Sequence, residues 1–180
     1  VLHRLDRVWQ ERYQRLGVLV RYADDECICC PSRERAEAAL AALAEILAGL
    51  GLSLAADKTR IVEVAGGVEG YDFLGFHHRM VPSRRNPKLR YPACWPSDSA
   101  MRRARSHIRE LTGRNRRHVP THVLVGDLNQ FLRGWRQYFR YGNSARCFAK
   151  LDRYVTERMA LLLSKRHGRH GRGNGMKHII

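Results

Sequence analysis

The sequence predicts an α+β fold in which a mostly antiparallel sheet carries helices on one face and is followed by a small all-α helical bundle. Within residues 1–80, stretches with helical spacing alternate with short strand-like runs. Residues 81–96 hold four of the six prolines together with basic side chains, so we expect a basic linker or a short exposed hairpin at this domain boundary. Residues 97–165 repeat apolar residues at helical spacing, and a basic flexible tail is expected over 166–180.

The first elements follow from a change in hydrophobic period. Apolar residues recur at helical spacing from Leu2 until Gly17. Residues 18–23 and 27–30 are short apolar runs with only an acidic stretch between them, which predicts a hairpin with a three-residue acidic turn. Arg21 is the one cation beside this turn. The acidic residues are Asp24, Asp25 and Glu26.

A helix and two strands are expected next. Pro31 and Ser32 mark a helix start, and Gly51 marks its end. The apolar stripe of this helix would consist of Ala36, Leu40, Leu43, Leu47 and Leu50. Residues 59–65 and 71–77 have the β-branched and aromatic content that is typical of strands, with two glycines between them.

Three helices are expected in the second domain. The first has Ser97 or Asp98 as its cap, the second covers residues 121–141, and the third is capped by Asn143 or Ser144. A glycine in the middle of a helix costs about 1 kcal/mol relative to alanine, so we expect a neighbouring helix to pack closely against Gly134. The inward-facing residues would be Met101, Ala104, Ile108 and Leu111, then Leu124, Leu128, Phe131, Trp135 and Tyr138 or Phe139, then Phe148, Leu151, Val155, Met159 and Leu162.

The charge is distributed unevenly along the chain. Residues 1–80 contain 10 Lys and Arg against 12 Asp and Glu, whereas residues 81–180 contain 23 against 5. A segment this basic repels itself unless a polyanion is present. Nucleic acid is favoured over a lipid surface, because the arginines are dispersed among aromatic and capping residues rather than massed beside an anchor.

The cysteines and the apolar stretches point to a reduced, non-membrane protein. Five cysteines and no preceding secretory segment predict free thiols in a cytoplasmic protein. A zinc site at Cys27 and Cys30, or at His167 and His170, is disfavoured, since these residues lie in an apolar run and in a Gly/Arg-rich tail. Residues 38–56 are rich in alanine and contain two glycines, which favours a buried helix over a membrane span.

The paired aspartates at the turn have two interpretations. Aspartate suits a hairpin turn because it tolerates left-handed backbone and bonds its own backbone. A turn at a sheet edge is also a rigid place to present carboxylates to Mg²⁺, which takes oxygen ligands. Two such ions about 4 Å apart could activate a 3′-hydroxyl and stabilise leaving pyrophosphate, and that chemistry requires at least one further carboxylate.

Four motifs carry a resemblance to a known family. YADD at residues 22–25, GLSL with DKT at 51–59 and FLGF at 73–76 resemble three consecutive blocks of reverse transcriptases, in the family's order. LNQFLRGWRQYF at 128–139 resembles the signature of the maturase-specific domain, also called domain X or the thumb, of group II intron proteins. The chain therefore resembles the C-terminal part of a group II intron reverse transcriptase/maturase, with part of the palm followed by the helical domain.

The resemblance implies roles for the motif residues. Asp24 and Asp25 would hold Mg²⁺ at the catalytic site, and Tyr22 and Ala23 would lie next to the nascent 3′ end. Lys58 would approach the incoming dNTP, although an ordinary exposed lysine is the alternative. The primer grip would include Phe73, Leu74 and Gly75, although a buried aromatic strand explains the same pattern.

The helical domain would bind group II intron RNA, beside an RNA template and a DNA primer in the palm. The aromatic residues of its signature are favoured as core rather than as base-stacking platforms. The arginines would make phosphate contacts that position RNA without reading its sequence. These are Arg102, Arg103, Arg105, Arg109, Arg133, Arg136, Arg140, Arg146 and Arg153. Whether two copies form a homodimer is left open.

The departures from the family limit the expected activity. The fingers and the strand with the first catalytic aspartate have no counterpart in the sequence, and both Asp6 and Glu11 lie in the opening helix. We therefore expect this chain alone not to polymerise DNA, although the full-length protein would be an RNA-directed DNA polymerase that also promotes splicing and mobility of the intron. One alternative is a degenerate or stand-alone RNA-binding maturase. Another is an unrelated nucleotidyl cyclase. This alternative is disfavoured, because such an enzyme would lack both the Lys58 block and the basic helices.

Overall fold

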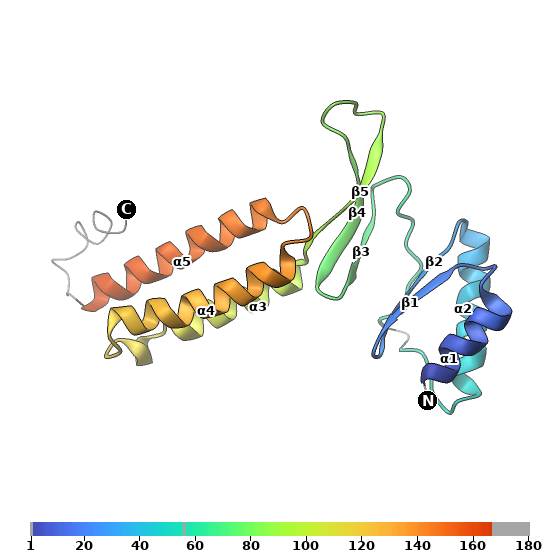
Figure 1. Ribbon diagram of the computed structural model, residues 1–180, viewed down its shortest axis with the longest axis horizontal. Helices are drawn as coiled ribbons and strands as arrows, with labels where there is room; N and C mark the ends of the chain where they lie inside the picture. The colour runs from blue at the N-terminus through green and yellow to red at the C-terminus, as the bar shows by residue number, and fades with distance from the viewer. Residues whose placement is uncertain (1, 56, 167–180) are drawn as a thin grey trace. The chain divides into compact units, whose positions relative to one another are not determined.

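The protein consists of two compact units, which are described separately. The structure, a computed structural model, describes residues 2–55 and 57–166. Of these residues, the first unit comprises 2–55, 57–74 and 79–92, and the second comprises 75–78 and 93–166. The architecture is α+β, as the sequence predicts: two small antiparallel sheets are followed by helices (Figure 1).

Helices cover one face of the first sheet. The helix α1 (Leu2–Val8) continues into a π-helical turn, η1 (Trp9–Tyr13), and α2 (Arg33–Ala48) follows the hairpin. The Ser32 hydroxyl caps α2 as predicted, accepting a hydrogen bond from the backbone N–H of Arg35 at 3.3 Å. Figure 1 shows α1 and α2 on the same side of β1 and β2. Their shared core consists of Leu5, Trp9, Ala39, Ala42, Leu43 and Leu47.

The buried stripe of α2 differs from the expected one. Leu43 and Leu47 are buried as predicted, but Ala36 and Leu40 are only half-buried. Alanines at positions 39 and 42 are buried in their place. The long run of alanines makes neighbouring faces of this helix almost equally apolar, so the sequence spacing alone did not distinguish them.

The predicted hairpin is formed by β1 (Val18–Tyr22) and β2 (Asp25–Cys29). The two strands are antiparallel, and Tyr22 is paired with Asp25 at the end of the ladder. The turn therefore contains two residues, Ala23 and Asp24, rather than the expected three. Ala23 adopts φ 55°, the left-handed conformation that two-residue turns often require.

The second sheet differs more from the expectation. It has the order β3 (Gly70–Phe73), β4 (Phe76–Pro82) and β5 (Arg90–Pro96), so residues 81–96 take the hairpin form rather than that of a linker. The expected single strand over 71–77 is wrong, because the chain turns at Leu74 and Gly75, which have φ values of 49° and 78°. Positive φ at both central positions is the geometry of a tight hairpin turn.

The strand predicted over residues 59–65 does not form, so this prediction is also wrong. The backbone N–H of Glu63 donates to the Glu69 carboxylate at 3.2 Å, so this group bonds to a side chain instead of to a neighbouring strand. Strand propensity measures how well side chains fit a paired, half-buried surface. Without a partner strand, the β-branched residues here remain in an irregular segment.

Three helices form the second unit, as predicted. They are α3 (Asp98–Leu111), α4 (Thr121–Phe139) and α5 (Ala145–Arg166), with a short 3₁₀ turn, η2 (Arg114–Arg116), after α3. The Ser97 hydroxyl caps α3 by accepting a hydrogen bond from the backbone N–H of Ala100 at 3.2 Å. The core contains the predicted residues Met101, Ala104, Ile108, Leu128, Leu151 and Met159, together with Cys147.

The expectation of a close helix neighbour at Gly134 is wrong. A methyl group added to this glycine would meet nothing within 4 Å. Gly134 lies on the exposed side of α4, so its cost in helix stability is not offset by packing among the described residues.

No helix in the described part of the chain is long and apolar enough to cross a membrane.

Candidate functional site

Two neighbouring carboxylates lie at the tip of the first hairpin. Asp24 occupies the second position of the turn, and Asp25 is the first residue of β2. Both side chains are exposed. Among residues 2–55 and 57–166, neither carboxylate accepts a hydrogen bond or forms an ion pair. The two groups are therefore available to a ligand in solution.

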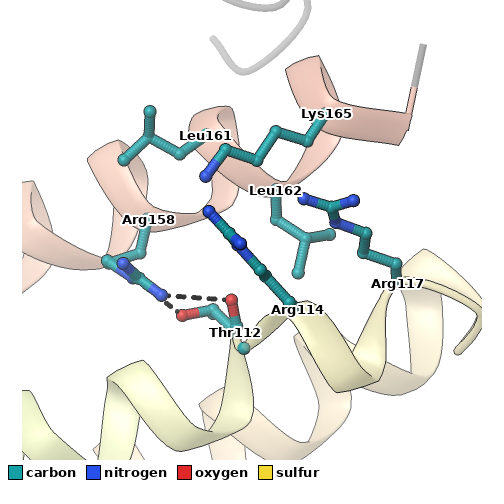
Figure 2. A pocket seen from close by; sticks show the side chains of 8 residues that line it. Thr112, Arg114, Arg117, Arg158, Leu161, Leu162 and Lys165 are labelled. Carbon is teal, nitrogen blue, oxygen red and sulfur yellow. Dashed lines mark hydrogen bonds between the residues drawn. The ribbon is translucent and has the colours of Figure 1, made fainter. Parts of the chain in front are cut away.

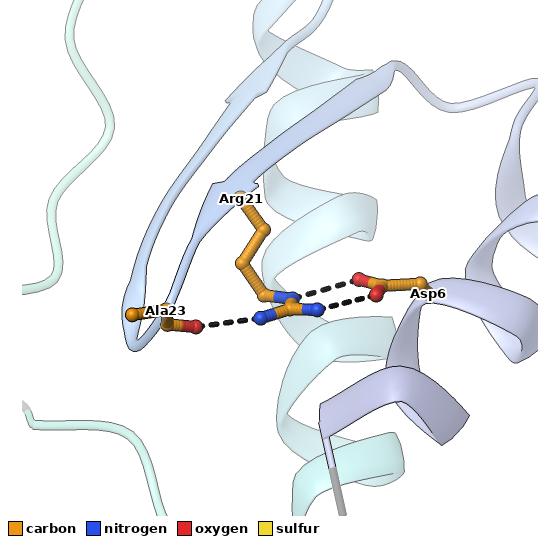
Figure 3. Close-up of polar contacts among 3 residues, drawn as sticks. All are labelled: Asp6, Arg21 and Ala23. Carbon is orange, nitrogen blue, oxygen red and sulfur yellow. Dashed lines mark hydrogen bonds and ion pairs between the residues drawn. The ribbon is translucent and has the colours of Figure 1, made fainter.

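The cation beside this turn is bound elsewhere. The Arg21 guanidinium donates two hydrogen bonds to the Asp6 carboxylate of α1, through Nε at 2.8 Å and through Nη2 (Figure 3). Its Nη1 donates to the backbone carbonyl of Ala23 at 2.6 Å. The hydrogen bonds between Arg21 and Asp6 lower the pKa of Asp6 and raise that of Arg21. Arg21 thus holds the backbone of the turn and leaves its carboxylates uncompensated.

The third acidic residue of the sequence run is in a different environment. Glu26 is paired with Arg21 across the two strands and is half-buried. Burial raises the pKa of Glu26, and the Arg21 charge lowers it in a smaller measure. Of the acidic groups around the hairpin, Asp6 and Glu26 therefore face Arg21, whereas Asp24 and Asp25 are free.

The hairpin carboxylates do not form a complete metal site by themselves. Within the described residues, no three His, Cys, Asp or Glu side chains lie together in a way that could hold a metal ion. The chemistry of Asp24 and Asp25 fits Mg²⁺, since both are exposed oxygen donors without a competing protein partner. They would supply two of the ligands that such an ion requires.

Two other residues with predicted roles at the active site, Tyr22 and Lys58, are exposed. Tyr22 is 67% exposed and lies on the same face of β1 as the exposed Val18 and Val20. Lys58 is exposed in a short turn, where its backbone N–H donates to the carbonyl of Ala55 at 3.0 Å. No hydrogen bond or ion pair joins Lys58 to either aspartate within the described residues.

The FLGF motif forms the β3–β4 turn and its flanks. Phe73, Leu74, Gly75 and Phe76 are all half-buried. The Phe76 ring lies 4.8 Å from the ring of Phe139 and 5.7 Å from that of Tyr138, both in α4. The last residue of this motif therefore has a packing role in the second unit.

The aromatic residues of the LNQFLRGWRQYF motif mostly belong to the core, as predicted. Phe139 is buried, and the Trp135 ring lies 4.6 Å from it. Trp135 also contacts Phe148 of α5 edge-on, with ring centroids 5.6 Å apart. Tyr138 is half-exposed, although its ring contacts Phe139.

The predicted RNA-binding arginines lie on the surface of the second unit. All are exposed except Arg105, which is half-buried. Two of them are engaged locally: Arg153 pairs with Glu157 at 3.0 Å, and Arg140 stacks on Tyr141 with its guanidinium carbon 4.7 Å from the ring centroid. The exposed members are Arg102, Arg103, Arg109, Arg133, Arg136, Arg140, Arg146 and Arg153.

Sequence reasoning missed the hydrogen bonds of Arg21. Its partners, Asp6 and Ala23, lie fifteen residues before it and two residues after it. The available signal was a single acidic residue in the opening helix, and nothing in the spacing marks that helix as a neighbour of the hairpin.

Two known protein families match the sequence, one in its first half and one in its second. Residues 1–78 match the family described as reverse transcriptase (RNA-dependent DNA polymerase). Residues 101–179 match the family described as group II intron, maturase-specific domain. A search of curated proteins found no match. The succession of these two domains shows that the chain belongs to the group II intron reverse transcriptase/maturase family.

Proposed function

We propose that the β1–β2 turn is part of the nucleotidyl-transfer site of an RNA-directed DNA polymerase. The observation that carries this proposal is the pair of exposed carboxylates, Asp24 and Asp25, which have no partner among the described residues. Both would hold Mg²⁺. When bound, the metal would supply Lewis-acid stabilisation of the reacting phosphate oxygens.

The residues around the turn would orient the substrates. Tyr22 and Ala23 would contact the primer end, because they directly precede Asp24 at the hairpin tip. Lys58 would bind the triphosphate of a dNTP and could give a proton to the leaving pyrophosphate. Phe73, Leu74 and Gly75 would support the primer, with the tight turn limiting their movement.

A further carboxylate must complete this site. Asp6 is engaged by Arg21, and Glu26 is half-buried beside the same guanidinium, so neither is free to join Asp24 and Asp25. We therefore expect the remaining metal ligand to come from outside the described residues, and we expect this chain alone to lack polymerase activity.

The exposed arginines of the helical unit would bind intron RNA and promote its splicing and mobility. They face solvent without a matching number of acidic neighbours, which favours contacts to phosphate. Phosphate contacts fix the position of an RNA without reading its sequence.

The polymerase proposal is tested by Asp24→Asn in the reverse transcriptase that contains this sequence. Loss of a metal ligand removes several kcal/mol of transition-state stabilisation, so primer extension should fall by roughly a thousandfold or more. Asp152→Asn, an exposed aspartate of α5, makes the same chemical change away from the turn and should leave extension unchanged. Equal activity of the two variants would refute a catalytic role for Asp24.

The alternative function, an RNA-binding maturase without polymerase activity, makes a different prediction. Its support is that the basic surface lies in the helical unit, which does not contain the aspartate turn. In that case Asp24→Asn would leave both RNA binding and splicing intact, and no form of the protein would extend a primer. RNA affinity should in either case fall steeply between roughly 50 and 200 mM salt.

A further inference from the structure

A basic pocket lies between the end of α3 and the last turns of α5. It has a volume of about 120 Å³ and is lined by Thr112, Gly113, Arg114, Arg117, Arg158, Leu161, Leu162 and Lys165 (Figure 2). One water molecule needs roughly 10–15 Å³ of such space, so the pocket has room for a tetrahedral anion. None of its four cationic residues is among the arginines that were predicted from the sequence to bind RNA.

One of the four cations has a structural role. Arg158 donates from Nε to the Thr112 hydroxyl at 3.0 Å and from Nη2 to the Thr112 carbonyl at 3.1 Å. A cation that bonds the last carbonyls of a helix satisfies groups that the helix leaves unpaired. The Thr112 hydroxyl also donates to the carbonyl of Ile108 at 2.7 Å, so it is not free for a ligand.

The other three cations are uncommitted. The side chains of Arg114, Arg117 and Lys165 are exposed and make no hydrogen bond or ion pair within the described part of the chain. No acidic residue lines the pocket. Like charges around one concave surface repel each other, and this repulsion decays over a screening length of roughly 8 Å at physiological salt. An anionic ligand would remove this repulsion.

The walls of the pocket are held in place by neighbouring contacts. Arg166 of α5 donates to the Thr121 hydroxyl at 2.9 Å, to the carbonyl of Val119, and to the carbonyl of Arg116 in η2 at 3.4 Å. Arg116 of η2 pairs with Asp127 of α4 at 2.5 Å. The η2 segment, which carries Arg114 and is followed by Arg117, is therefore tied to both α4 and α5. A preformed site loses less entropy when it binds a ligand.

We infer that this pocket binds a phosphodiester group of the RNA backbone. Guanidinium groups suit phosphate because their donors form a planar fork. Leu161 also lines the pocket and is 51% exposed, so it offers an apolar surface for the adjoining ribose. This inference rests on the proposed RNA binding and assigns it a particular place, distinct from the open helix faces that carry the arginines expected from sequence.

The test is RNA binding by the complete chain with Arg114→Gln/Arg117→Gln. Arg84→Gln/Arg85→Gln is the matched control, because it removes the same charge from exposed residues in the β4–β5 connection. The probe is a structured RNA hairpin, and affinity is measured across a salt series. The pocket variant should bind roughly tenfold or more weakly and should lose about one unit of salt slope, because the contact to one phosphate is removed. The control should lose clearly less.

Each result has one meaning for the pocket. If both double variants weaken binding equally, affinity follows net charge and the pocket inference is overturned, while RNA binding itself stands. If the unaltered chain does not bind RNA, both the pocket and the proposed RNA function fail. If the pocket variant loses binding to vesicles of phosphatidylserine and phosphatidylcholine but keeps RNA affinity, the ligand is lipid and the inference is wrong.

Two further variants separate binding from folding. Lys165→Gln changes an exposed residue near the end of α5 and should lower affinity severalfold without altering the circular dichroism spectrum. Arg117→Lys keeps the charge and should retain most of the affinity that Arg117→Gln loses. If the Arg114→Gln/Arg117→Gln variant does not fold, Lys165→Gln decides the question alone. An unchanged RNA affinity of Lys165→Gln would then count against the pocket.

Discussion

The Arg21 guanidinium joins the Asp6 carboxylate of α1 to the β1–β2 turn, because the same group also donates to the carbonyl of Ala23. Ala23, the residue before the candidate catalytic Asp24, is thus linked to α1 through the Arg21 side chain. Ala23 has a left-handed backbone, which is unfavourable for alanine and needs support from its surroundings. The arginine provides that support without neutralising Asp24 or Asp25.

Arg21→Gln should impair catalysis without removing any metal ligand. Freeing the Ala23 carbonyl allows the turn to move, and small displacements at a reacting centre can cost up to roughly a hundredfold in rate. We expect kcat for primer extension, measured in the reverse transcriptase that contains this sequence, to fall by about tenfold or more, with RNA affinity unchanged. Arg33→Gln breaks an exposed pair with Glu37 and serves as the control. Equal kcat values for the two variants would exclude a positioning role.

The contribution of Asp6 to stability should disappear at low pH. The hydrogen bonds from Arg21 lower the pKa of this carboxyl in the folded protein. A lowered folded pKa stabilises the protein above the unfolded value, about 3.9 for aspartate, and the stabilisation is lost as pH falls through the folded pKa. The thermal midpoint of the unaltered chain should exceed that of Asp6→Asn at pH 7, and the difference should vanish towards pH 2. A difference that persists at that pH would contradict this assignment.

Gly134→Ala should stabilise the protein. The added methyl group meets nothing within 4 Å, so the helix gains about 1 kcal/mol of propensity without a clash. Urea unfolding monitored by circular dichroism would measure the gain. Gly75→Ala is the contrasting variant, because φ 78° at that position should cost about 1–2 kcal/mol. Destabilisation by Gly134→Ala would show that a neighbour does approach this face.

Cys29 should react with thiol reagents well before Cys27. Cys29 is exposed, whereas burial raises the pKa of Cys27 to about 11, with the neighbouring Cys29 adding to the shift. The thiolate is the reactive form, and at pH 8 only about one Cys27 in a thousand would carry it. Brief iodoacetamide treatment followed by mass spectrometry would rank the two sites. Faster labelling of Cys27 would mean that the hairpin opens or that the thiol is less buried.

The sequence predicted the elements whose signals are local. Ser32 and Ser97 are helix caps because a hydroxyl next to the first turn needs only its own neighbours to act. The acidic hairpin was recognisable for the same reason, although its turn is one residue shorter than expected. The helical core residues followed from spacing, since each helix of the second unit has one apolar face.

Features that depend on distant partners could not be predicted. Residues 59–65 have strand-like composition, but no neighbouring strand pairs with them. The pairing of Arg21 with Asp6 and the gathering of Arg114, Arg117 and Lys165 require knowledge of how helices and strands pack. In the sequence, Lys165 lies more than forty residues from the other two.

The aromatic contacts of Phe76 bear on how the helical domain could be exchanged between proteins. Residues 75–78 belong to the second unit, although the polymerase family match includes them. The carbonyl of Cys94 accepts a hydrogen bond from the backbone N–H of Asn143 at 2.5 Å, so the helices also depend on β5. A chimera joined at residue 97 would leave Phe139 without its Phe76 neighbour. Recombination that preserves a folded helical domain should therefore carry the chain from the FLGF turn onward as one inherited piece.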